Sequence, residues 1–89
     1  MADLHHVICG RRFRIRFAPL RNSHGTCTDP AERSPTITIA NNLDDLGTLE
    51  AILHEGLHAS AYQLLSEEYV ETTAHDLARL LARMGYKRK

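Results

Sequence analysis

Residues 46–64 read LGTLEAILHEGLHASAYQL, and this stretch decides the fold. Its leucines recur every three to four residues, which is the repeat of one face of an α-helix. These are Leu46, Leu49, Leu53 and Leu57. The spacing predicts a helix from about residue 46 to residue 64. A short acidic side chain just before it, Asp44 or Asp45, can accept hydrogen bonds from the free amides of the first turn.

A second helix follows at once. Ser66 is a typical N-cap, and Glu67 and Glu68 come directly after it, where negative charge favours the helix dipole. Gly85 is a natural stop, because glycine accepts the left-handed conformation that often ends a helix. The connection between the two helices is short, so they are predicted to pack as an antiparallel hairpin.

The N-terminal part predicts β-structure. An apolar run over residues 4–9 is followed by a turn at Gly10 and by a segment in which Phe and Ile alternate with Arg over residues 12–17. This period of two predicts a hairpin with one buried and one cationic face. Residues 21–35 read as a loop, and residues 36–40 as a short edge strand. The expected fold class is α+β, with a small N-terminal sheet packed on a C-terminal two-helix hairpin in a single domain over residues 1–89.

Composition excludes several classes of protein. The 89 residues carry 11 Lys plus Arg and 11 Asp plus Glu, so no overall charge draws the chain to nucleic acid or to anionic lipid. The arginines of residues 11–21 form a local basic stripe, which is expected to be a solvated strand face. No apolar run has the roughly 20 residues of a membrane helix, and no secretory signal opens the sequence. We expect a cytoplasmic protein with Cys9 and Cys27 reduced.

The chemistry is expected at His54-Glu55-Gly56-Leu57-His58, an HExxH motif inside the first predicted helix. One helical turn separates the two histidines, so both imidazoles point the same way and can share one Zn²⁺ ion. Glu55 projects about 100° away from His54, where it can act as a general base on water without becoming a ligand. Gly56 lies in mid-helix at a cost in helix propensity, which predicts the close approach of another group.

A catalytic zinc needs a third protein ligand and an open fourth position. A helical hairpin that turns near Leu65 places Glu71 opposite His58 and His75 opposite His54, so Glu71 is the predicted third ligand. The alternatives are Glu67, Glu68 and His75. His75 can also act as an orienting partner of Glu71.

The HExxH motif followed by an acidic residue on a second helix resembles the gluzincin-type zinc peptidases. It is more similar to the short HExxH proteins of phage and prophage genomes, in the style of ImmA/IrrE and SprT-like domains. The segments that carry the resemblance are FRIRF, GTCTDP, TITIA, LEAILHEGLHA and SEEYVETTAHDLARLLARMGY. The resemblance implies His54 and His58 as zinc ligands, Glu55 as the catalytic base and an acidic third ligand.

The expected activity is zinc-dependent hydrolysis of a peptide bond in a peptide or protein substrate. Residues 36–40, as the predicted edge strand, would pair with the extended substrate. Tyr69, Tyr86, His75 or an arginine would stabilise the oxyanion. The alternative function is a non-catalytic, zinc-stapled interaction or regulatory domain of phage or prophage origin. Glu55 favours the enzyme, because a purely structural zinc site does not need a carboxylate beside its first histidine.

Overall fold

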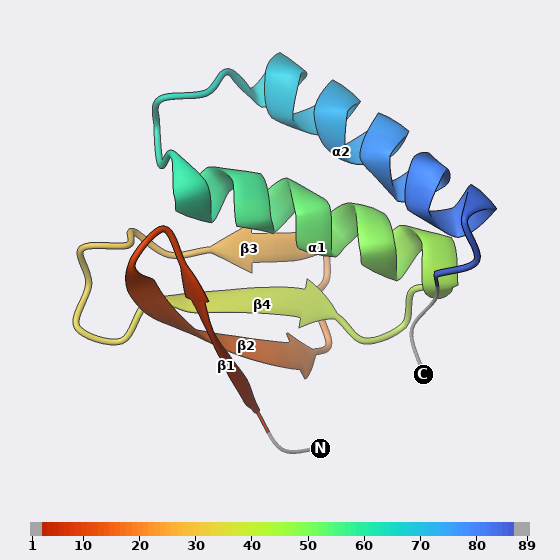
Figure 1. Cartoon of the computed structure of the whole chain (residues 1–89). Helices are drawn as coiled ribbons and strands as arrows, with labels where there is room; N and C mark the ends of the chain where they lie inside the picture. Colours follow the sequence, from red (N-terminus) through yellow and green to blue (C-terminus); the bar gives the residue numbers. More distant parts are fainter. Residues whose placement is uncertain (1–2, 87–89) are drawn as a thin grey trace.

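The computed structural model describes residues 3–86. They form an α+β fold in which a sheet precedes two helices, as the sequence predicted (Figure 1). The sheet has four strands, whereas the sequence predicted three. The strands and helices are β1 (Leu4–Ile8), β2 (Arg11–Ala18), β3 (Gly25–Cys27), β4 (Thr36–Ala40), α1 (Asp45–Ser60) and α2 (Glu67–Arg83). The predicted domain limits include residues 1–2 and 87–89, which lie outside the described residues.

The sheet has the strand order β1-β2-β4-β3. The β1–β2 and β3–β4 pairs are antiparallel, whereas β2 and β4 run parallel. The predicted hairpin is therefore present, but the prediction that residues 36–40 form an edge strand was wrong. β4 lies inside the sheet, because β3 arises from residues 25–27 of the predicted loop and pairs along its outer side. A strand of three residues is too short to show a period of two in the sequence.

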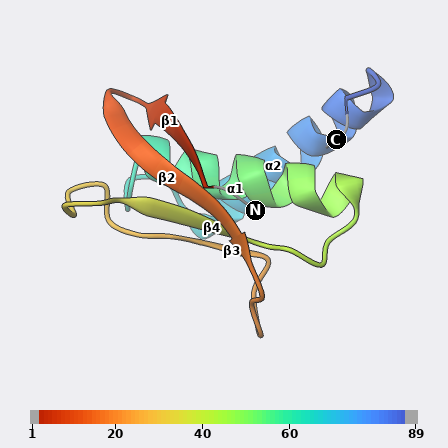
Figure 2. The same ribbon diagram turned by 90° about the horizontal axis from the view of Figure 1, so that it is seen from below.

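Buried and more exposed residues alternate along β2 and β4, so one face of the sheet packs into the core. Phe13 on β2 and Ile37 and Ile39 on β4 are almost fully buried, and they pack with Ala51 and Ala59 of α1. The intervening arginines of β2 lie on the opposite face, which neither helix covers (Figure 2). Antiparallel and parallel pairing thus combine into one sheet with one apolar side.

The helices stack in sequence on that apolar side. α1 packs against β3 and β4, and α2 packs on α1 without contacting the strands in the described part of the chain (Figure 1). The buried positions of α1 are Thr48, Ala51, Glu55 and Ala59, at intervals of three or four residues. The most buried stripe is thus made of small side chains and one carboxylate, and the predicted leucines flank it in half-buried positions. Glu55 lies between α1 and the sheet.

Hydrogen-bonded caps fix where the helices begin. Asp44 accepts a bond of 2.7 Å from the Gly47 amide, and Ser66 accepts one of 3.1 Å from the Tyr69 amide, as the sequence predicted. α1 ends at Ser60, four residues before the predicted end at residue 64. Residues 61–66 then form an irregular connection that includes Gln63 at a φ of 63°. Neither helix of residues 3–86 is long and apolar enough to cross a lipid bilayer.

Candidate metal centre

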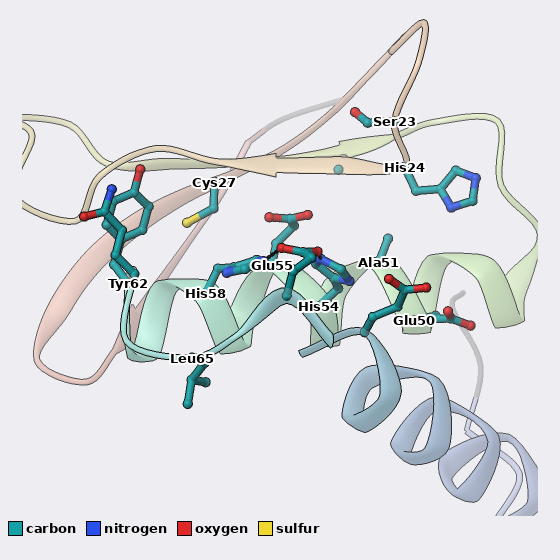
Figure 3. A pocket seen from close by; sticks show the side chains of 14 residues that line it. Ser23, His24, Cys27, Glu50, Ala51, His54, Glu55, His58, Tyr62 and Leu65 are labelled. Atoms are coloured by element: carbon teal, nitrogen blue, oxygen red, sulfur yellow. Dashed lines mark ion pairs between the residues drawn. The ribbon is translucent and has the colours of Figure 1, made fainter. Parts of the chain in front are cut away.

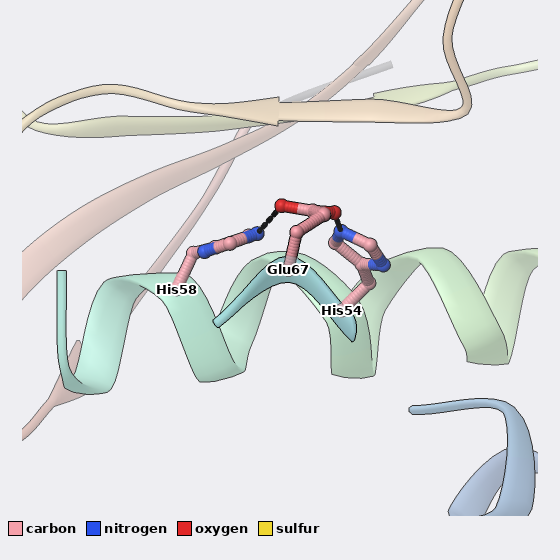
Figure 4. A group of neighbouring side chains, drawn as sticks. All are labelled: His54, His58 and Glu67. Carbon is pink, nitrogen blue, oxygen red and sulfur yellow. Dashed lines mark ion pairs between the residues drawn. The ribbon is translucent and has the colours of Figure 1, made fainter. Parts of the chain in front are cut away.

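Three side chains converge above the middle of α1 (Figure 4). Nε2 of His54 lies 2.8 Å from Oε1 of Glu67, and Nε2 of His58 lies 3.1 Å from Oε2 of the same carboxylate. The imidazole ring centroids are 5.0 Å apart. One ligand atom from each of the three residues lies within 4.8 Å of the others.

The histidines come together because of local helix geometry. They are four residues apart on α1, which places them one turn apart on the same face. Both side chains are mostly buried, with 23% and 21% of their surface exposed, whereas 64% of the Glu67 side chain is exposed. The pair is therefore held firmly by its helix, and the carboxylate closes over it from the solvent side.

The acidic member of the group is Glu67, whereas the sequence predicted Glu71. The difference comes from the connection between the helices. A tight turn at Leu65 would have placed Glu67 near that turn, about one helical turn too far along the axis to reach the histidines. Residues 61–66 instead double back, so that Glu67, the first residue of α2, lies level with His54 and His58. Glu71, one turn further along α2, lines the same pocket without contacting the imidazoles.

The donor set fits a zinc ion. Zinc in proteins takes imidazole nitrogens and carboxylate oxygens at about 2.0–2.2 Å, and two such ligands at tetrahedral angles lie about 3.3 Å apart. The two contacts of 2.8 and 3.1 Å between histidine and carboxylate are close to that separation. Two imidazoles and one carboxylate also leave a fourth position free for water or substrate, as catalytic zinc sites require.

Glu55 lies beside this group and points toward β3 (Figure 3). The residue is only 7% exposed, and it accepts no hydrogen bond from any residue in the range 3–86. Burial raises the pKa of its carboxyl group; the nearby His54 and His58 lower the pKa, and Glu67 raises it. The outcome is a raised pKa, because loss of hydration outweighs the attraction to the histidines.

β3 forms the wall opposite the helices. A Cβ atom built on Gly25 would lie 2.9 Å from Cγ of Glu55 and 3.2 Å from the Thr38 carbonyl oxygen, so a side chain there would collide with Glu55 of α1 and with the backbone of β4. The sequence predicted a close approach at Gly56 instead. No described part of the protein makes it, because a Cβ atom on Gly56 would meet no described atom within 4 Å. Glycine is needed on the strand and not on the helix.

Cys27 is the other side chain of β3 that lines the pocket. Its thiol donates to the Thr28 carbonyl oxygen at 3.3 Å. Burial, together with the negative charge of Glu55, raises the pKa of the Cys27 thiol from 9.0 to about 11. The thiol is therefore protonated at neutral pH, and Cys27 is a free cysteine in the described part of the chain.

The whole site is a pocket of about 790 Å³ between β3 and the two helices (Figure 3). Its lining residues are Ser23, His24, Gly25, Cys27, Glu50, Ala51, His54, Glu55, His58, Tyr62, Gln63, Leu65, Glu67 and Glu71.

Several of the predicted site residues lie elsewhere. Tyr69, Tyr86 and His75 are exposed and do not line the pocket, and His75 instead contacts Asp76 at 3.3 Å. Glu68 is also exposed outside it. Tyr62 and His24 line the pocket, although the sequence did not indicate either as a site residue. Tyr62 follows His58 by four residues, a spacing that could have indicated it.

Searches of protein-family models, of curated proteins and of solved structures give no match to this chain.

Proposed function

We propose that this protein is a zinc-dependent hydrolase that cleaves a peptide bond, with His54, His58 and Glu67 as the ligands of the metal and Glu55 as the general base. The observation that carries the proposal is the convergence of two imidazoles and one carboxylate beside a buried carboxylate that has no hydrogen bond. This proposal keeps the predicted resemblance to gluzincin-type peptidases and moves the acidic ligand from Glu71 to Glu67.

A zinc ion bound there would supply a Lewis acid that acidifies water and polarises a carbonyl group. Glu55 would accept the proton of the attacking water and pass it to the leaving amine. Its position supports this role, because it comes from the residue next to His54 but faces the strand side of the pocket (Figure 3). Glu55 is thus close to the proposed ligands without being one of them. No side chain of residues 3–86 forms a hydrogen bond with its carboxylate oxygens.

Substrate would be held by β3. One side of this strand pairs with β4, and within residues 3–86 no strand pairs with its other side. Gly25 and Cys27 of the strand both line the pocket. An extended peptide can add to such an edge through backbone hydrogen bonds, which would lay a scissile bond across Glu55. β3 thereby replaces residues 36–40 as the proposed substrate strand.

The test compares zinc-loaded wild-type protein with the Glu55→Gln variant on a mixture of quenched fluorescent peptides. We expect one equivalent of zinc in both proteins and a loss of hydrolysis of about 10²–10⁴-fold in the variant, the usual contribution of a general base. Glu68→Gln is the matched control, because Glu68 is an exposed acid outside the pocket, and it should hydrolyse as the wild type does.

Full hydrolysis by Glu55→Gln, or loss of zinc from it, would show that Glu55 has another role. Zinc binding by the wild type without any hydrolysis would favour the alternative, a zinc-stapled interaction domain.

A further inference from the structure

The pocket is lined by four glutamates and, among the described residues, by no lysine or arginine. The glutamates are Glu50, Glu55, Glu67 and Glu71. The chain as a whole has equal numbers of acidic and basic residues, so this is a local arrangement. Clefts lined by one sign of charge concentrate ligands of the opposite sign.

The negative charges of three of the four glutamates have a positive partner in the structure or would have one when zinc is bound. Glu67 contacts the two histidines, and Oε1 of Glu50 accepts a bond of 2.9 Å from Arg79. A bound zinc ion would carry two positive charges, which the carboxylates of Glu55 and Glu67 would balance. Glu71 is exposed and has no ion-pair partner within residues 3–86, so its negative charge is left for a ligand.

The remaining residues give the pocket two different ends (Figure 3). Cys27, Tyr62 and Leu65 lie toward one end, and neither these residues nor the neighbouring Gln63 carries a charged group. Ser23, His24 and Glu50 lie toward the other end, with the histidines and Glu55 between. Figure 1 shows that α2 runs back along α1 toward the N-terminal end of α1. Glu71 follows Glu67 by one turn of α2 and is therefore displaced toward the end of α1 that carries Glu50.

We propose that the substrate carries a lysine or arginine directly after the cleaved bond, bound by Glu71, and an apolar residue before it, near Tyr62. This inference rests on the proposed function. The direction follows from β3, which runs from the Ser23 end toward the Tyr62 end. Antiparallel strand pairing is slightly more stable than parallel pairing, so the substrate would run the opposite way and place its C-terminal half beside Glu71.

A second observation supports a ligand at this place. Glu55 points into the pocket, is 7% exposed and has no hydrogen bond within residues 3–86. No fully buried side-chain oxygen of these residues lacks a partner, so the Glu55 oxygens remain open to the pocket and can accept a hydrogen bond from a ligand. A bound peptide would supply a hydrogen-bond partner for Glu55, and its basic side chain would lie further along the pocket, beside Glu71.

The test measures binding separately from cleavage. Fluorescently labelled hexapeptides with a central Leu-Lys, Leu-norleucine or Lys-Leu pair are titrated with the zinc-loaded Glu55→Gln protein, and binding is followed by anisotropy. We expect Leu-Lys to bind about tenfold more tightly than the other two, the value of one hydrogen bond to a charged group. The preference should disappear when Glu71→Gln is added and should persist when Glu68→Gln is added.

Equal affinity for the three peptides, absence of binding, or a preference that survives Glu71→Gln would overturn the inference. The same peptides are incubated in parallel with zinc-loaded wild-type protein. Cleavage without a charge preference contradicts only this inference, whereas Glu71-dependent binding without any cleavage contradicts only the proposed function.

Discussion

The two walls of the pocket are built from different kinds of residue. The helical wall carries the groups that can hold an ion, namely His54, His58 and Glu67. The strand wall carries Gly25 and Cys27, which are small and uncharged at neutral pH. Glu55 is a residue of α1, in the helical wall, but its side chain packs against Gly25 in the strand wall.

This difference separates two tasks. The helices supply the groups that could bind a metal ion, whereas the strand removes water from Glu55 and Cys27, so that burial raises the pKa of both groups. We therefore expect changes in the helical wall to act on zinc binding. Changes in the strand wall should act on stability and on the reactivity of the groups packed against it.

The largest effect is expected from His58→Ala. A ligand that binds only the folded state at 1,000 times its dissociation constant stabilises it by about 4 kcal/mol, and the variant should lose this gain because one of three ligands is missing. The measurement is the unfolding midpoint with and without zinc. His75→Ala is the control, since His75 lies outside the pocket. A chelator-insensitive wild-type protein would contradict the prediction.

The second-largest effect is expected from Glu67→Ala, and it should be clearly larger than that of Glu71→Ala. Glu67→Ala should weaken zinc binding by about 100-fold or more, since even residues that merely orient a ligand cost 10–100-fold. Glu71→Ala should change it by less than about threefold, because Glu71 does not contact the imidazoles. Competition with a chromophoric chelator measures both affinities. If Glu71→Ala has the larger effect, the third ligand is Glu71 as the sequence suggested.

On the strand wall, Cys27 should react with iodoacetamide about tenfold more slowly than the exposed Cys9 at pH 8, because its raised pKa leaves less thiolate and its greater intrinsic nucleophilicity offsets only part of this. Its rate should keep rising until the pH reaches about 11. Peptide mapping by mass spectrometry follows both sites.

The same raised pKa has a consequence for stability. The protonated Cys27 thiol stabilises the fold below its ordinary pKa of 9.0, and this contribution is lost as the pH rises through about 11. Equal alkylation rates for Cys9 and Cys27 would show that the strand wall does not bury the thiol.

The smallest effect is expected from a pair of glycine substitutions. Gly25→Ala should destabilise the fold by about 1–2 kcal/mol, because its Cβ would meet Glu55 and the Thr38 carbonyl. Gly56→Ala should stabilise it by about 0.5–1 kcal/mol, because alanine is the better helix former and the space is open. Urea unfolding measures both. The opposite signs would mean that the helix and not the strand makes the close approach.

The helical wall was largely predictable from the sequence. The pairing of His54 with His58 depends on the pitch of one helix, and the caps Asp44 and Ser66 depend on their own first turns. Such features need no knowledge of distant parts of the chain. The alternation of β2 likewise gave the hairpin and its apolar face.

What the sequence could not provide depends on longer-range geometry. The choice of Glu67 over Glu71 is set by the path of residues 61–66, which carries no periodic signal. The position of β4 inside the sheet is set by β3, a three-residue strand that exists only because β4 offers it a partner. Gly25 could not be distinguished from a loop glycine for the same reason.

The central claim is that one divalent ion fits between His54, His58 and Glu67. Diffraction at the zinc absorption edge from crystals grown with zinc tests it most directly. The account predicts a single strong anomalous peak about 2.0–2.2 Å from both Nε2 atoms and from a Glu67 oxygen. A map in which the imidazoles and the carboxylate stay in direct contact, with no peak between them, would contradict it.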